Sequence, residues 1–315
     1  MRKTPNLIVS ALIVLAALAV GFFFRGRLAP PPWAAQLLPE GDFILYIDLK
    51  ALDLAGLSKS GPVQLESDYK EFVEQTGIQI ERDLEAVAMS RRDTPDHRDV
   101  ESSEIFVGHF DADRLKNYLQ KIATAEEYRD HTVYLSLHEG HSVRVCILDP
   151  RRVAVTNMER IDPMHGIIDR FISRHTAGPS LLDAFYGRVP HGSVGWVIAR
   201  APNQGSPQLP AGFSLPPDSI VVASLRYDAA LQFRADISAQ SETQARQVVE
   251  DANNHLALVH SVAESLGAQG QDRDLKAAFD SLHVEQKENV AVFTATIPQS
   301  LIRKIWSEVQ TDQKP

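Results

Sequence analysis

The sequence predicts an α+β protein, in which an N-terminal transmembrane helix is followed by antiparallel sheets with helices packed on one face. Three observations predict this class. Residues 7–24 form an apolar run without a charged side chain. The rest of the chain alternates short apolar runs, typical of strands, with stretches whose apolar residues recur at helical spacing. A proline-rich break lies at 201–218, and the segments 38–49 and 215–226 begin alike, which suggests two related units although the match is too degenerate to count as a repeat.

The segment 7–24, LIVSALIVLAALAVGFFF, is predicted to be an uncleaved signal anchor. As a helix it would span roughly 27 Å at about 1.5 Å per residue, close to the ~30 Å hydrocarbon core of a bilayer. Basic residues flank it, with Arg2 and Lys3 before it and Arg25 and Arg27 after it. Two alternatives stay open: a signal peptide cut after the Ala-Leu-Ala sequence within the run, and a buried core helix of a soluble protein.

Residues 1–27 are therefore assigned to the anchor, with the N-terminus expected inside. The flanking charges are nearly balanced, so the positive-inside rule favours this orientation only slightly, and the habit of short N-terminal anchors agrees with it. The C-terminal domain would then lie outside the cytoplasm. Residues 28–40 are read as a stiff proline-rich spacer that holds the folded body off the membrane, with Trp33 near the interface. The body is more acidic than the chain's net charge of −9, because residues 1–27 hold only basic charges.

The first unit, residues 41–200, combines predicted strands with amphipathic helices. Apolar runs predict strands over 43–47, 84–90, 104–110, 132–137, 143–148, 153–156 and 193–200. Apolar stripes predict three helices: one carrying Leu65, Tyr69, Phe72 and Val73 and closed by Gly77; one capped by Asp111 with Leu115, Tyr118, Leu119 and Ile122 inward; and one beginning at Asp162 with Ile167, Ile168, Phe171 and Ile172 inward. Residues 91–104 carry charges of both signs and are read as a solvated turn.

The break at 201–218 contains five prolines and is read as a linker between the units, or as a long surface loop between two halves of one sheet. The similar starts of the units, at 38–49 and 215–226, suggest an ancient duplication. The second unit, residues 219–310, begins with a predicted hairpin over 219–226 and 231–238. A helix follows from a capping box at Ser241 and Gln244 to Gly267, and a short helix capped by Asp272 comes next. The unit ends with a predicted hairpin over 283–287 and 290–297 and a helix from Pro298 that buries Leu301, Ile302, Ile305 and Trp306.

The long helix of the second unit leaves an alternative open. Apolar residues within 241–266 recur at the spacing of a coiled-coil seam, so pairing with a second copy is conceivable. A helix lying across a sheet is favoured, because additional apolar residues widen its apolar face beyond a seam. Residues 311–315 are read as a disordered tail.

No motif in the sequence is typical of a catalytic, cofactor or metal site, and we assign no residue to one. The single cysteine, Cys146, excludes an intramolecular disulfide and a Cys-x-x-Cys site, and it is expected to be buried. The segment 138–141, His-Glu-Gly-His, is one residue short of zincin spacing and is read as a solvated hairpin tip, with a weak surface metal site as the alternative. Ser67 and Lys70 match only the first element of penicillin-interacting enzymes. The acidic body argues against nucleic-acid binding.

Short motifs run through residues 38–302. They are Leu38-Pro39-x-Gly41-Asp42, Tyr46-Ile47-Asp48-Leu49, Thr76-Gly77-Ile78 with Glu81-Arg82-Asp83-Leu84, Gly108-x-Phe110-Asp111-x-x-Arg114-Leu115, and Ile297-Pro298-x-x-Leu301. Behind an anchor and a proline-rich spacer, this arrangement resembles a class of bacterial membrane-anchored proteins of unknown function. The resemblance implies an α+β domain on the periplasmic side of the bacterial inner membrane, and it carries over no catalytic residue.

Two hypotheses for the function follow. The favoured one is a non-enzymatic binding or interaction module of the cell envelope, tied to the lipid bilayer by its N-terminal helix and bound to an unknown protein or envelope component. The alternative is an envelope enzyme whose active site is assembled from dispersed residues, because catalytic geometry need not appear as a linear motif.

Overall fold

The structure is a computed structural model, and it describes residues 30–57, 67–93, 100–138, 141–174, 177–203, 208–209, 213–265 and 273–302. Within these ranges no helix is long and apolar enough to cross a membrane. The expected anchor at 7–24 and the tail at 311–315 lie outside the described residues, as do Ile305 and Trp306.

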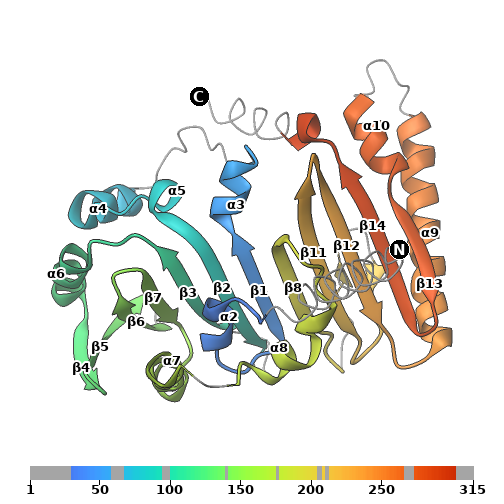
Figure 1. The fold of residues 1–315 in the computed structure, drawn as a ribbon. Coiled ribbons are helices and arrows are strands. Elements are labelled where there is room, and N and C mark those ends of the chain that lie inside the picture. Colours follow the sequence, from blue (N-terminus) through green and yellow to red (C-terminus); the bar gives the residue numbers. More distant parts are fainter. Residues whose placement is uncertain are drawn as a thin grey trace, which may run out of the picture.

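A single antiparallel sheet runs through the body (Figure 1). It has 12 strands in the order β13-β14-β12-β11-β8-β1-β2-β3-β7-β6-β5-β4. Their bounds are β1 (Phe43–Asp48), β2 (Leu84–Asp93), β3 (Val100–Gly108), β4 (Thr124–Tyr128), β5 (His131–His138), β6 (His141–Asp149), β7 (Arg152–Thr156), β8 (Ser193–Arg200), β11 (Ile220–Asp228), β12 (Ala230–Ser238), β13 (His283–Lys287) and β14 (Val290–Ile297). The short strands β9 (Gln208–Leu209) and β10 (Phe213–Ser214) pair separately.

The predicted α+β class with antiparallel pairing is confirmed. The proline-rich break at 201–218 does not interrupt the sheet, because β8 before it pairs with β11 after it, Val222 lying opposite Ile198. Strand β8 also pairs with β1 on its other side. Both predicted halves therefore share one sheet.

The strand order repeats outward from the middle of the sheet. From β1 the successive neighbours are β2, β3, β7 and β6, and from β8 they are β11, β12, β14 and β13. In each direction the chain forms a hairpin, crosses by a helix to the outer strands and returns. This order relates β1 to β8 and β2 to β11, whereas the similar segments 38–49 and 215–226 lead into β1 and β11. The division into separate units stays a prediction.

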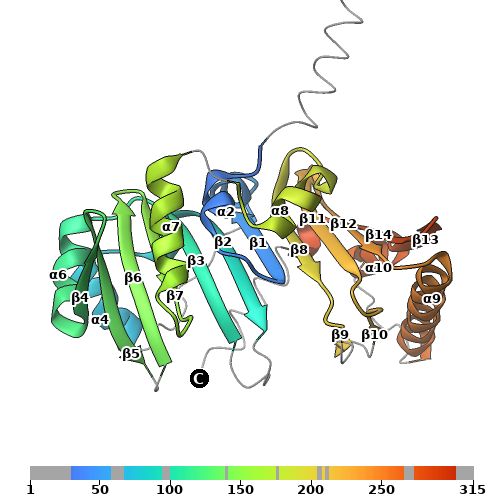
Figure 2. The same cartoon turned by 90° about the horizontal axis from the view of Figure 1, so that it is seen from below.

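Three helices cover one side of the sheet, the front face: α2 (Trp33–Leu37), α7 (Asp162–Ser173) and α8 (Ser180–Phe185) (Figure 2). They form one core with front-facing strand residues such as Ile44 and Ile198, both of which are fully buried. Helix α7 begins at Asp162 as predicted, and Ile167 and Ile168 are fully buried. Ile172 is 44% exposed, so its predicted inward position is wrong, since it lies beside the stripe that meets the sheet.

The expected spacer is wrong from residue 33 onward. Residues 33–37 are α2, and Ala35, Leu37 and Leu38 are fully buried or nearly so. The Trp33 ring stacks on Phe171 with a centroid distance of 5.3 Å and so packs against the folded domain. The prolines at 30–32 start this helix instead of extending a linker, consistent with the preference of proline for helix starts.

The opposite side, the back face, carries α4 (Ser67–Thr76), α6 (Ala112–Ile122), α9 (Glu242–Ser265) and α10 (Arg273–Asp280) (Figure 2). Helix α6 packs on β5 and β6 beside α4, while α9 packs on β13 and β14, and α10 packs on β14. The expectation of helices on one face only is therefore wrong. The physical reason lies in the outer strands, whose back-facing side chains are apolar as well: Val153 of β7 shares a core with Leu115 of α6, and Ile237 of β12 shares one with Val248 of α9.

The capping signals of the back-face helices are confirmed, but the predicted inward position of Ile122 in α6 is wrong, because this residue is 50% exposed. The Asp111 carboxylate accepts a hydrogen bond from the Arg114 N–H at 3.0 Å, and Ser241 Oγ accepts one from the Gln244 N–H at 3.2 Å. Buried residues of α9 such as Ala245 and Val248 face the sheet, as the favoured reading of this helix predicts. The helices α3 (Leu49–Leu54) and α5 (Ile80–Asp83) lie between β1 and β2 in the chain.

The predicted solvated turn at 91–104 is wrong at both ends. Residues 91–93 belong to β2 and residues 100–104 belong to β3, which pair across from each other. Their polar side chains find partners inside the sheet: Ser103 Oγ donates to Thr156 Oγ1 at 2.8 Å, and both residues are fully buried. The sequence also missed β4, an edge strand whose residues are largely exposed.

Candidate functional site

The motifs weighed in the sequence do not come together into a site. The backbones of His138 and His141 lie opposite each other at the end of the β5–β6 hairpin, as predicted for a hairpin tip. Ser67 and Lys70 lie on α4. Cys146 is fully buried in the front-face core, and burial raises the pKa of its thiol to about 12. Within the described ranges no group of three or more His, Cys, Asp or Glu side chains could hold a metal ion.

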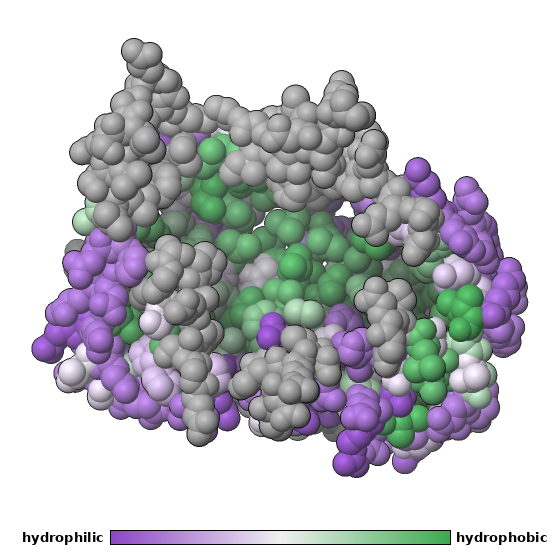
Figure 3. All heavy atoms as spheres, turned by 180° about the vertical axis from the view of Figure 1, so that it is seen from behind, coloured by the Kyte–Doolittle hydropathy of each residue, from purple (hydrophilic) through white to green (hydrophobic). Residues whose placement is uncertain are grey.

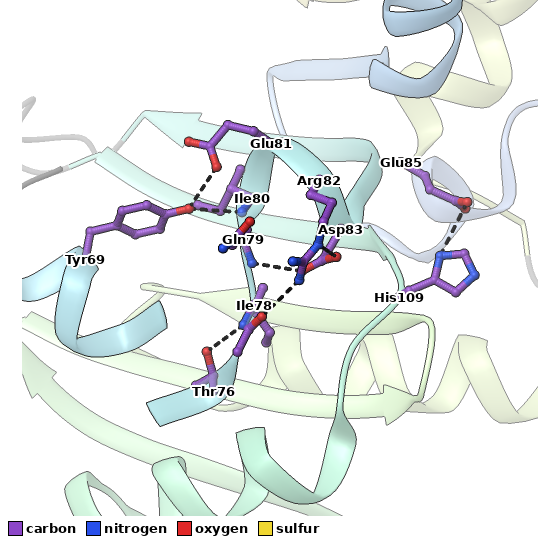
Figure 4. Close-up of polar contacts among 11 residues, drawn as sticks. Tyr69, Thr76, Ile78, Gln79, Ile80, Glu81, Arg82, Asp83, Glu85 and His109 are labelled. Carbon is purple, nitrogen blue, oxygen red and sulfur yellow. Dashed lines mark hydrogen bonds and ion pairs between the residues drawn. The ribbon is translucent and has the colours of Figure 1, made fainter. Parts of the chain in front are cut away.

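A polar network joins α4 to α5 (Figure 4). The Tyr69 hydroxyl accepts a hydrogen bond from the Ile80 N–H at 2.9 Å and donates one to Glu81 at 3.2 Å. The Asp83 carboxylate accepts from the Gln79 N–H at 2.8 Å and from the neighbouring Arg82 guanidinium. The hydrogen bonds from Arg82 hold the pKa of Asp83 below its usual value. These contacts fix the turn that leads from α5 into β2.

A second polar cluster surrounds Glu85 at the start of β2. Its carboxylate accepts from Lys50 at 3.0 Å and lies 3.6 Å from His109, and it also pairs with Arg151 (Figure 4 shows Glu85 and His109). The hydrogen bond from Lys50 and the charge of Arg151 hold the pKa of Glu85 below its usual value. The Glu85 carboxylate is engaged by basic side chains from α3 and from the turn between β6 and β7, so the cluster is suited to holding α3, β2 and this turn together.

The central strands present a different feature on the back face. Adjacent residues point to opposite faces of a sheet, so the register assigns each side chain to a face. In β11, Val221 shares a back-face core with α9, and the residues that pair with it across β8 and β1 are Ala199 and Phe43. We call the set of back-facing side chains at the centre the apolar floor. It comprises Phe43, Leu45, Ile47, Val87, Met89, Val197, Ala199, Ala223, Leu225, Tyr227, Leu231 and Phe233.

The apolar floor is only partly covered. Each of its side chains is partly exposed, whereas the front-facing neighbours Ile44, Trp196, Ile198 and Val222 are at most 3% exposed. The back-face helices named above pack over the outer strands and so flank the floor on both sides. Figure 3 shows hydrophobic residues gathered in a hollow at the centre of this face, with hydrophilic residues toward both flanks.

One carboxyl group lies beside the apolar floor. Glu104 of β3 is paired with Met89 in the register and therefore also points to the back face. Burial raises the pKa of Glu104, and a hydrogen bond from Ser102 offsets part of this effect. The floor is thus bounded on this side by a carboxyl group that is more easily protonated than an exposed one.

Sequence reasoning missed the apolar floor, although a signal for it is present. The runs in β1, in β8 and in the first half of β11 are apolar without alternation, which indicates two apolar faces rather than one. What the runs do not show is which face the helices leave open, because that depends on where the connections cross.

Comparisons with known proteins add a likeness of fold only. No protein-family model matches the chain, and no curated protein matches it. Among solved structures, crystal form I of a protein named TP0453 has a TM-score of 0.44 at 14% identity, covering 87% of this chain and 96% of the other. Crystal form III gives 0.46 at 14%, covering 87% and 98%, and crystal form IV gives 0.44 at 13%, covering 90% and 98%. A similarity of this size does not bear on ligands or partners.

Proposed function

We propose that this protein is a non-enzymatic binding module of the bacterial cell envelope, that residues 7–24 anchor it in the membrane, and that the apolar floor is its binding surface. The anchor is supported by the uncharged run and its basic flanks. The domain would stand outside the cytoplasm, with α2 beginning a few residues after the anchor ends.

The observation that carries the proposal is the contrast between the two faces of the same strands. On the front, Ile44, Ile198 and Val222 are at most 3% exposed, and on the back the apolar floor keeps partial exposure. Exposed apolar surface costs about 25 cal/mol per Å² relative to buried surface. Contiguous apolar patches are therefore kept small in soluble proteins, and larger ones mark sites where another molecule binds.

The ionisable groups favour binding over catalysis. Asp83 and Glu85 are engaged by basic side chains near the surface, which suits a structural role. An enzyme needs an acid or a base that faces the bound substrate together with a group to orient it. Among the described residues, the floor itself contributes only the phenol of Tyr227, and Glu104 and Arg91 lie at its border.

A photo-crosslinking residue tests the proposal in the intact envelope. Benzoylphenylalanine replaces Phe233 in the full-length chain, an aromatic group for an aromatic group, so the probe lies on the floor. The matched control carries the same probe at Leu137, an apolar residue of β5 that is 75% exposed and lies off the floor. We expect an irradiation-dependent covalent adduct from Phe233 that the Leu137 probe does not form. The proposal fails if the two positions give the same products, or if neither gives any.

A further inference from the structure

We infer that the apolar floor binds the hydrocarbon chain of a lipid. The inference rests on the proposed function, since it takes the floor as the binding surface and the anchoring membrane as the source of the ligand. Its content is the chemical class of that ligand: the long unbranched acyl chain of a phospholipid, the bulk lipid of the anchoring membrane.

The chemistry of the floor selects an apolar ligand. Side chains in its central row, such as Leu45, Val197 and Ala223, are hydrocarbon only. The backbone beneath them is paired on both sides, because β1 pairs with β2 and β8, and β8 pairs with β1 and β11. Backbone donors and acceptors engaged in ladders are not offered to a ligand. A polar ligand would lose its hydration here without regaining hydrogen bonds.

The size of the floor favours a lipid chain over a protein partner. From β2 to β12 it spans four strand spacings, roughly 19 Å, and from Phe43 to Ile47 it spans roughly 14 Å along the strand. The product is on the order of 270 Å², whereas a stable protein interface buries about 800 Å² on each partner. A surface of this size between flanking helices matches a small apolar ligand, which sites of this kind enclose in a concave pocket.

The shape of the floor comes from the sizes of its side chains. Its middle strand, β8, contributes the small residues Gly195 and Ala199, and Ala223 lies beside them on β11. Gly195 is buried, and a Cβ atom added there would make ordinary van der Waals contacts at 3.5–4.0 Å. Larger side chains, such as Leu45, Met89 and Phe233, lie on β1, β2 and β12. The small residues thus lie between larger ones on this face, where Figure 3 shows a hollow.

Photoactivatable lipid tests the inference directly. Full-length protein is reconstituted in vesicles of phosphatidylcholine containing a fraction with a diazirine in one acyl chain, irradiated and digested, and the labelled peptides are identified by mass spectrometry. Labelling of residues 7–24 serves as the internal reference. We expect additional labelling on the back-facing residues of β8, β11 and β12.

Substitutions that fill the hollow of the floor provide a second test. Ala223→Trp places a large ring at the centre of the floor, and we expect it to lower floor labelling about tenfold relative to residues 7–24, equivalent to about 1.4 kcal/mol of binding. Val197→Phe is a second, smaller filling. Leu137→Trp adds the same ring at an exposed position off the floor and should leave the labelling unchanged. Continued protection of Cys146 from maleimide shows that a variant still folds, because this thiol lies in the front-face core.

Unlabelled competitors test the phospholipid source. Lysophosphatidylcholine should compete in preference to palmitate, and the reverse would overturn a phospholipid as the ligand. Labelling confined to residues 7–24 in the unmodified protein would overturn the inference, and so would equal losses in Ala223→Trp and Leu137→Trp. If the floor stays unlabelled while the Phe233 probe captures a protein, only the ligand class is wrong. If the Phe233 probe captures nothing, the proposed function fails as well.

Discussion

Two adjacent residues of β1 distinguish the covered face of the sheet from the open one. Ile44 is fully buried against the front-face helices, and Leu45 is a partly exposed residue of the apolar floor. Truncating a fully buried isoleucine to alanine costs about 2–5 kcal/mol, because the protein loses the transfer free energy of the removed atoms and also keeps an unfavourable cavity. Leu45→Ala removes a side chain that water already reaches in part and leaves no closed cavity. We expect it to cost about 1 kcal/mol, and Ile44→Ala about 3–4 kcal/mol.

The single cysteine provides the assay. Cys146 is fully buried, so in urea the extent of its modification by a brief maleimide pulse reports the unfolded fraction of the full-length protein. The shift of the urea midpoint, multiplied by the slope of the transition, gives the change in the free energy of unfolding for each variant. Leu45→Ser is the matched third variant. It should behave like Leu45→Ala, because a hydroxyl on a hydrated surface keeps its hydrogen bonds to water.

The reasoning is refuted if truncation costs the same free energy of unfolding on both faces of the sheet. If Leu45→Ala lowers the free energy of unfolding as much as Ile44→Ala, then Leu45 lies in a closed core and the floor is covered in the folded protein. A much larger loss for Leu45→Ser than for Leu45→Ala would lead to the same conclusion. Either outcome would remove the basis for a binding surface on the back face.

Three further predictions use the same thiol assay. For Glu104, burial raises the folded pKa above the unfolded value of about 4.3, so its contribution to stability is present below that pH and is lost as the pH rises through the folded pKa. Glu104→Gln should therefore raise the urea midpoint at pH 7 and have little effect near pH 4, and an unchanged midpoint at pH 7 would contradict the burial of this carboxyl. Arg144 is 8% exposed, and its guanidinium donates to the Met158 carbonyl at 2.6 Å and the Glu159 carbonyl at 2.9 Å. Arg144→Met should lower the free energy of unfolding by about 1–3 kcal/mol, while Arg160→Met, at an exposed position, should change it little. Equal effects of the two substitutions would show that the hydrogen bonds of Arg144 to these carbonyls do not stabilise the fold. In the native protein Cys146 should react with maleimide at least about a thousandfold more slowly than a thiol introduced by Leu137→Cys, since burial disfavours the thiolate and blocks access. Comparable rates would place Cys146 outside a stable core.

Many strands and helix starts could be predicted from the sequence, because they are determined by residues that are neighbours in the chain. The strand at 193–200 and the hairpin at 283–297 lie where their apolar runs and turn signals predict them. The start of α6 follows from the capping side chain of Asp111. In contrast, β4 reads Thr-Ala-Glu-Glu-Tyr, and its strand conformation comes from pairing with β5 rather than from its own residues.

Pairing between distant segments explains the other errors. Residues 101–104 are polar, and taken alone they are expected to be exposed to solvent. They are ordered in the sheet because the Ser103 hydroxyl meets Thr156, a residue that is 53 positions away in the chain. The spacer was misread for a similar reason: the short run after the prolines is buried by α7, which comes far later in the sequence.

The open floor follows from the way the chain connects its strands. In each half of the sheet, the helix that follows the central hairpin leads to the outer strands, so α6 comes to lie over β5 and β6, and α9 over β13 and β14, on the back face. The segments that precede the two central strands, α2 before β1 and α8 before β8, pack on the front face instead. The repeated strand order thus covers the centre of the front twice and leaves the centre of the back between two helical walls. Strands that are apolar on both faces then expose an apolar hollow at one place, the middle of the back, and this is why the pairing order, and not any single motif, points to the binding surface.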